Sequence, residues 1–141
     1  MTATLVHASC IAIGGRAVLI SGRSGSGKSD LALRLIDRGA GLVSDDYTAL
    51  EPQAGWLLAS APERIAGKLE IRGIGIVDLN PLADVPVALL VDLDLAPERM
   101  PDSATRPLSG IKIPVIGLAA LEASAPIKVE SALLRFGLPL S

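Results

Sequence analysis

Blocks of apolar residues, separated by glycine-rich turns, predict strands and helices along most of the chain. The apolar runs 9–13 and 16–20 flank Gly14 and Gly15, and a two-residue glycine spacing of this kind is typical of a tight β-hairpin. Further along, 28–39 has helical periodicity. We expect an amphipathic helix there, with an apolar face made of Leu31, Ala32, Leu35 and Ile36.

The remaining pattern favours a mixed arrangement of short strands and one closing helix. In chain order we expect a buried strand in 41–46, a hairpin in 47–60, a short helix and an extended piece in 61–79, a buried strand in 86–95, a loop with one short strand near Lys112 in 96–114, and a helix in 124–137. This order is not a strict βαβ alternation. It predicts an α/β fold with a mixed sheet and flanking helices.

Composition limits the classes of protein to consider. A chain of 141 residues with 50% hydrophobic residues predicts one compact domain over 1–141. A net charge of -2 provides no basic field for nucleic acid. Cys10 is the only cysteine, which favours a reducing compartment, and no stretch has the length of a membrane span. We therefore expect a cytoplasmic protein that binds neither nucleic acid nor membrane.

One segment carries a recognisable phosphate-binding pattern. It satisfies G-x-x-x-x-G-K-S/T between an apolar run and the predicted helix, which is the context that this Walker A motif requires. Backbone N–H groups of such a loop converge on phosphate oxygens, and the helix N-terminus adds a positive dipole. The alternative is a flexible Ser/Gly linker. The nucleotide-binding candidates are Gly22, Arg23, Ser24, Gly25, Ser26, Gly27, Lys28 and Ser29.

Acidic residues after the next predicted strand are candidates for phosphoryl-transfer chemistry. Asp45 and Asp46 at this strand end would hold Mg²⁺, accept a proton from an attacking hydroxyl, or simply cap a turn. Glu70 would lie near phosphate and metal, or form a surface ion pair with Arg72. His7, the single histidine, would orient an incoming group or have only a structural role.

Three segments together resemble the catalytic, C-terminal domain of HPr kinase/phosphorylase. They are 7–39, 42–46 and 69–78, the last of which reads LEIRGIGIVD. The resemblance implies a P-loop domain of the phosphoenolpyruvate carboxykinase-like type. It also implies a protein-serine kinase that uses ATP and Mg²⁺ to phosphorylate HPr, the phosphocarrier protein of the phosphotransferase system, and a homo-oligomer, commonly a hexamer.

The resemblance also implies roles for single residues. Lys28 would contact phosphate, and Ser29 and Glu70 would bind Mg²⁺. Asp45 would be the general base that activates the substrate serine and the proton donor in the reverse reaction. His7 falls at the position of a histidine in the family's catalytic site.

Other positions set this chain apart from the family pattern or align with it loosely. Arg99 corresponds to a later active-site arginine, with Arg106 as the competing choice. Arg23 replaces a common acidic residue. Because His7 already belongs to the catalytic domain, we expect a short form without the family's N-terminal domain. The segment after 113–115 lacks the family's P-G-R-N, which leaves the reverse, phosphorylase reaction open.

Two other classes of function are compatible with the same residues. The first is another P-loop kinase with a different acceptor, because the loop and the acids would serve both. The second is a nucleotide-sensing module without catalysis.

Overall fold

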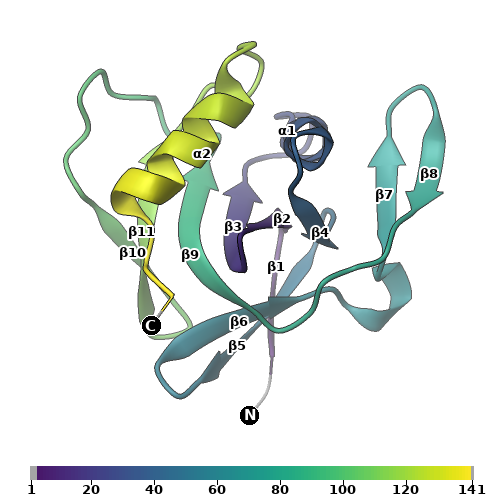
Figure 1. Cartoon of the computed structure of the whole chain (residues 1–141), viewed down its shortest axis with the longest axis horizontal. Coiled ribbons are helices and arrows are strands. Elements are labelled where there is room, and N and C mark those ends of the chain that lie inside the picture. The colour runs from purple at the N-terminus through teal and green to yellow at the C-terminus, as the bar shows by residue number, and fades with distance from the viewer. Residues whose placement is uncertain (1–2, 141) are drawn as a thin grey trace.

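A computed structural model describes residues 3–140 (Figure 1). The helices are α1 (Lys28–Asp37) and α2 (Ala125–Phe136), with a single 3-10 turn, η1 (Glu63–Ile65). The strands are β1 (Thr4–Val6), β2 (Ala8–Ile13), β3 (Arg16–Ser21), β4 (Gly41–Ser44), β5 (Thr48–Gln53), β6 (Trp56–Ser60), β7 (Lys68–Ile71), β8 (Gly75–Asp78), β9 (Val85–Asp92), β10 (Thr105–Leu108) and β11 (Ile111–Gly117).

Most strands join one mixed, strongly curved sheet. Its order is β1-β5-β6-β9-β3-β2-β4, and β11 also pairs with β9 and carries β10. The pairs β3–β9 and β9–β11 are parallel and bring Ser21, Asp92 and Gly117 to one edge. The hairpin β7–β8 forms a separate small sheet that stands apart beside α1 (Figure 1). The predicted mixed α/β class is confirmed.

Two apolar cores lie on opposite faces of the central strands, as the period of two along a strand requires. On β3, Val18 and Ile20 pack against α1 and α2, whereas Leu19 faces the second core with Leu50 and Leu90. Both helices therefore cover the same face, which Figure 1 shows above β3 and β9. Within the described residues, no helix is long and apolar enough to cross a membrane.

The predicted hairpin and the first helix are confirmed. Strands β2 and β3 pair antiparallel around Gly14 and Gly15, whose φ values of 58° and 84° are the left-handed conformation that the turn needs. The helix ends at Asp37, and just beyond it Gly39, with φ 110°, donates a hydrogen bond to the carbonyl of Ile36.

The expectation for 96–114 was only partly right. The short strand near Lys112 is present as the start of β11, but β10, which pairs antiparallel with it, was expected to be loop. Prolines are generally excluded from central strands, which hid the pattern. Pro107 is tolerated because β10 is at the edge of the sheet, and Pro114 lies opposite Thr105 in the register.

Candidate functional site

The glycine-rich loop joins β3 directly to α1 and wraps around the N-terminus of that helix. Gly25 and Gly27 have φ values of 82° and 101°, and Gly27 is the N-cap of α1. The Nζ atom of Lys28 donates to the carbonyl oxygens of Gly22 at 2.8 Å and Arg23 at 3.1 Å. The ammonium group is thereby folded back over the loop, where a bound anion would lie.

Ser26 gives this loop an unsatisfied polar group. Its Oγ atom is buried and has no hydrogen-bond partner, although buried hydroxyl groups generally have one. An oxygen of a phosphate group within the loop would supply an acceptor for it. The loop residues therefore fit a phosphate, with Lys28 and the helix dipole providing positive charge.

Asp45 lies at the centre of a hydrogen-bond cluster beside this loop. Its side chain is almost completely buried. The Oδ1 atom accepts hydrogen bonds from Ser29 Oγ at 2.6 Å and Ser9 Oγ at 3.0 Å, and Oδ2 accepts one from the backbone amide of Glu70 at 3.2 Å. Segments from β2, α1, β4 and β7 thus converge on one carboxylate.

Asp46 is in a different environment. It is exposed, has a left-handed φ of 69°, and its Oδ1 lies 3.0 Å from Nε2 of His7. The ring of His7 is 5.0 Å from that of Tyr47. The turn after β4 therefore directs one aspartate inwards to the loop and the next outwards to solvent, beside the only histidine.

The residues beside the glycine-rich loop could bind Mg²⁺ only together with the phosphate groups of a nucleotide. Within residues 3–140, no group of three or more His, Cys, Asp or Glu residues is arranged to hold a metal ion. Mg²⁺ commonly uses one or two protein oxygens and completes its shell with water and substrate phosphates. The oxygens of Ser29 and Asp45, 2.6 Å apart beside the loop, fit this requirement. Glu70 reaches the same cluster through its backbone amide.

The three candidate arginines lie at different places around the site. Arg23 is exposed, with its Nε 3.8 Å from Asp94, so an acid offsets the charge that it brings to the loop. Arg99 lines a pocket between the segment after β9 and α2. Arg106 pairs with Asp92 at 2.8 Å and lines a small cavity with His7. Of the two candidates, Arg106 therefore lies nearer the histidine.

Ser9 is the residue of this cluster that the sequence did not indicate. It lies in β2, is fully buried, and hydrogen-bonds to Asp45. A serine inside an otherwise apolar strand was the available signal. Of the predicted residues, Ser29 and Asp45 are in direct contact, and Glu70 joins them through its backbone amide although the residue is exposed. Lys28 directs its Nζ to the loop carbonyls instead. His7 lies beside this group through Asp46.

A glycine-rich loop between a strand and a helix, next to a buried aspartate, defines an α/β protein of the phosphate-binding class. A family model described as the HPr serine kinase C-terminal domain matches residues 1–83. The chain belongs to this family.

Relatives and a solved structure support the same family. HPr kinase/phosphorylase of Clostridium botulinum is 43% identical over 79 residues, which is 56% of this chain and 26% of that protein. The protein of the same name from Geobacillus thermodenitrificans is 42% identical over 108 residues, 70% of this chain and 35% of that one. The chain thus spans about a quarter to a third of the length of these curated relatives.

The similarity to a solved structure extends over nearly the whole chain. The HPr(Ser) kinase/phosphatase of Coxiella burnetii superposes with a TM-score of 0.80 and 32% identity, covering 94% of this chain and 95% of that one. The segment beyond residue 83, including the β10–β11 hairpin and α2, therefore has a counterpart in that structure.

Proposed function

We propose that the protein is an ATP- and Mg²⁺-dependent serine kinase that phosphorylates an HPr-type phosphocarrier protein in the cytoplasm. The observation that carries the proposal is the convergence of Lys28, Ser29 and Asp45 at the N-terminus of α1. Phosphoryl transfer depends on such positioning and charge neutralisation. The acceptor is inferred from the HPr kinases that the chain resembles over most of its length.

The two aspartates suit different steps of this reaction. Asp45 was the general base expected from the sequence, but its oxygens already accept three hydrogen bonds and it is buried. A general base must lie within reach of the hydroxyl of the incoming substrate. Asp46 is exposed and paired with His7. We therefore assign the role of general base to Asp46 and the binding of Mg²⁺ to Asp45.

The remaining residues would hold and neutralise the nucleotide. Lys28 would exchange its two carbonyl acceptors for phosphate oxygens, and Ser26 would donate to the same group. Ser29 and Asp45 would hold Mg²⁺, with Glu70 next to them. When bound, the ion neutralises charge that develops on the transferred phosphoryl group. His7 would orient Asp46, and Arg99 would contact the nucleotide.

Several finer features complete the proposal. We place the fold within the phosphoenolpyruvate carboxykinase-like P-loop type, with 1–141 as one catalytic domain that acts as a homo-oligomer. The reverse, phosphorolytic reaction is proposed as a second activity, since the relatives are named HPr kinase/phosphorylase and HPr(Ser) kinase/phosphatase.

A phosphorylation assay tests the function directly. The protein is incubated with Mg²⁺, radiolabelled ATP and the HPr-type protein of the same organism, and the product is mapped by mass spectrometry. We expect one phosphoserine on the carrier. Lys28→Met serves as the inactive control. Label on a small metabolite, or tight ATP binding without transfer to the carrier, would favour another kinase or a nucleotide-sensing module.

A further inference from the structure

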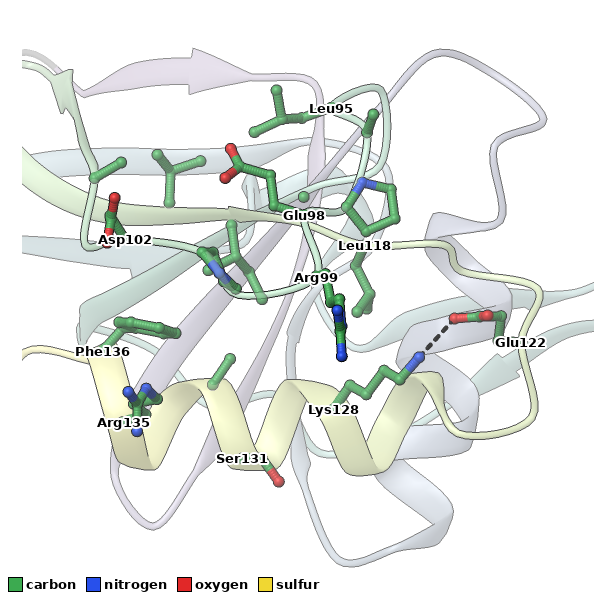
Figure 2. A pocket seen from close by; sticks show the side chains of 18 residues that line it. Leu95, Glu98, Arg99, Asp102, Leu118, Glu122, Lys128, Ser131, Arg135 and Phe136 are labelled. Atoms are coloured by element: carbon green, nitrogen blue, oxygen red, sulfur yellow. Dashed lines mark hydrogen bonds and ion pairs between the residues drawn. The ribbon is translucent and has the colours of Figure 1, made fainter.

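A cavity lies near the phosphate loop, and neither Asp45 nor Asp46 lines it. We call it the β9–α2 pocket. It has a volume of about 430 Å³ and lies between the loop 93–104 and helix α2, with walls that include Leu95, Leu118 and Phe136. Figure 2 shows Arg99 reaching from the loop towards α2, with Lys128 and Glu122 at one end and Arg135 at the other.

Two chain segments connect this pocket to the phosphate loop. A Cβ atom added to Gly22 would lie 3.1 Å from Cβ of Leu93, and one added to Gly27 would lie 3.3 Å from Cβ of Ala120. Leu95 is two residues from Leu93, and Leu118 is two residues from Ala120; both line the pocket. Since two residues of extended chain span at most about 7 Å, the pocket begins within that distance of residues that touch the loop.

The pocket and the acids lie on opposite sides of the loop. In the order β9-β3-β2-β4, the loop follows β3, whereas Asp45 and Asp46 follow β4. The pocket is built on the segments that follow β9 and β11, on the other side of β3. A nucleotide with its phosphates on the loop and its reacting end at the acids would therefore direct its other end into the pocket.

The lining has the chemistry that a nucleoside needs. The volume is within the range of small-molecule sites, which are mainly apolar with a few convergent polar groups. Phe136, the only phenylalanine of the chain, would provide a stacking face in exchange for the Arg135 guanidinium, which lies 5.5 Å from the centroid of its ring. The carboxylates of Glu98 and Asp102 on the loop would accept hydrogen bonds from ribose hydroxyls or from an exocyclic amino group.

We propose that the β9–α2 pocket binds the nucleoside part of the donor nucleotide, an assignment that rests on the proposed kinase function. The loop 93–104 and helix α2 would enclose the base and ribose, while the glycine-rich loop holds the phosphates. The Asp94 carboxylate, which accepts a hydrogen bond of 3.0 Å from the backbone amide of Arg23, ties the pocket loop to the phosphate loop. This hydrogen bond would connect the part of the site that binds the base to the part that binds the phosphates.

Calorimetric titration with two ligands separates the pocket from the phosphate site. Mg·ATP has a nucleoside and Mg·tripolyphosphate does not. Ala104→Phe places a ring in the pocket, and Phe136→Leu removes the stacking face while remaining apolar. Ala83→Phe, at an exposed loop position outside the pocket, is the matched control. Thermal melting verifies that each variant is folded before the titrations are compared.

We expect both pocket variants to weaken Mg·ATP binding, by about tenfold for loss of the stacking ring, and to leave Mg·tripolyphosphate affinity within about twofold of wild type, which is about 0.4 kcal/mol. Unchanged ATP affinity, or an equal loss for both ligands, would overturn the pocket assignment alone. Failure of the wild-type protein to bind either ligand would overturn the proposed kinase function and the pocket with it.

Discussion

Ser9 holds both aspartates of the site through a single hydroxyl group. Its Oγ donates to Asp45 Oδ1 at 3.0 Å and accepts from the backbone amide of Asp46 at 3.2 Å. Ser9 is fully buried in β2, so neither bond competes with bulk water. The hydroxyl therefore fixes the direction of the turn after β4, which decides that Asp45 faces the loop and Asp46 faces solvent.

Replacing Ser9 tests this positioning role. Ser9→Ala leaves the Asp46 amide without its partner, and we expect it to lower the free energy of unfolding by about 1–3 kcal/mol. It should also lower kcat about tenfold with little change in the KM for ATP, because Lys28 and the loop are untouched. Urea unfolding and steady-state kinetics measure both effects. Ser9→Thr retains the hydroxyl, and its failure to recover kcat would contradict the role.

Separate substitutions distinguish the functions of the two aspartates. Asp45→Asn would turn an amide group towards the donors Ser29 and Glu70 N–H, so we expect Mg²⁺ to lose its effect on ATP affinity. Asp46→Asn changes an exposed side chain and should preserve Mg·ATP affinity while reducing transfer at least a hundredfold, on the order of a lost general base.

Titration of ATP with and without Mg²⁺, beside single-turnover transfer, separates these outcomes. His7→Gln is the companion variant, because His7 contacts Asp46 and not Asp45. It should resemble Asp46→Asn in a milder form. The reverse result, in which Asp45→Asn binds Mg·ATP normally but does not transfer, would return the base to Asp45.

Features fixed by local sequence were predictable, and features fixed by distant contacts were not. The turn at Gly14 and Gly15 and the loop up to Lys28 depend on neighbouring residues, so their patterns were informative. The contact from Ser9 to Asp45 joins residues 36 positions apart. The sequence of an apolar strand does not indicate which distant residue its one serine will contact. Likewise, the opposite directions of Asp45 and Asp46 combine these Ser9 contacts with a left-handed φ at Asp46, which no local pattern indicated.

The same difference between local sequence and distant contacts explains why β10 and the β9–α2 pocket were not predicted. Pro107 and Pro114 are poor strand formers by local propensity, yet both lie in the antiparallel β10–β11 pair, where Pro107 is opposite Lys112 and Pro114 opposite Thr105. The β9–α2 pocket combines 95–104 with residues of α2, and no motif spans that separation. Arg99 and Arg106 could therefore be distinguished only in the folded structure, where they line different pockets.

Two glycines of the phosphate loop differ in how closely other atoms pack around them, so replacing each by alanine measures the free-energy cost of that packing. Both Gly25 and Gly27 have positive φ, so alanine at either position should cost about 1–2 kcal/mol. Nothing lies within 4 Å of a Cβ on Gly25, whereas one on Gly27 would lie 3.3 Å from Ala120. We expect Gly27→Ala to be more destabilising in urea unfolding by a further 1 kcal/mol or so. Equal losses would show that Ala120 moves aside freely.

Cys10 links stability to alkaline pH. It lies fully buried in β2, and burial raises the pKa of its thiol far above the ordinary value of 9.0. The folded chain therefore keeps the proton, while the unfolded chain releases it above about pH 9. Because the unfolded state then binds fewer protons, the free energy of unfolding falls as pH rises, by about 1.4 kcal/mol per pH unit from this group.

Comparison with Cys10→Ala isolates the contribution of this thiol. The substitution should lower stability at every pH through the lost packing, but the difference between variant and wild type should narrow by about 1.4 kcal/mol between pH 8 and pH 10. Urea unfolding at the two pH values measures that difference. Parallel losses in both proteins would mean that the Cys10 thiol ionises in the folded state as readily as in the unfolded chain, contrary to its burial between β3 and β4.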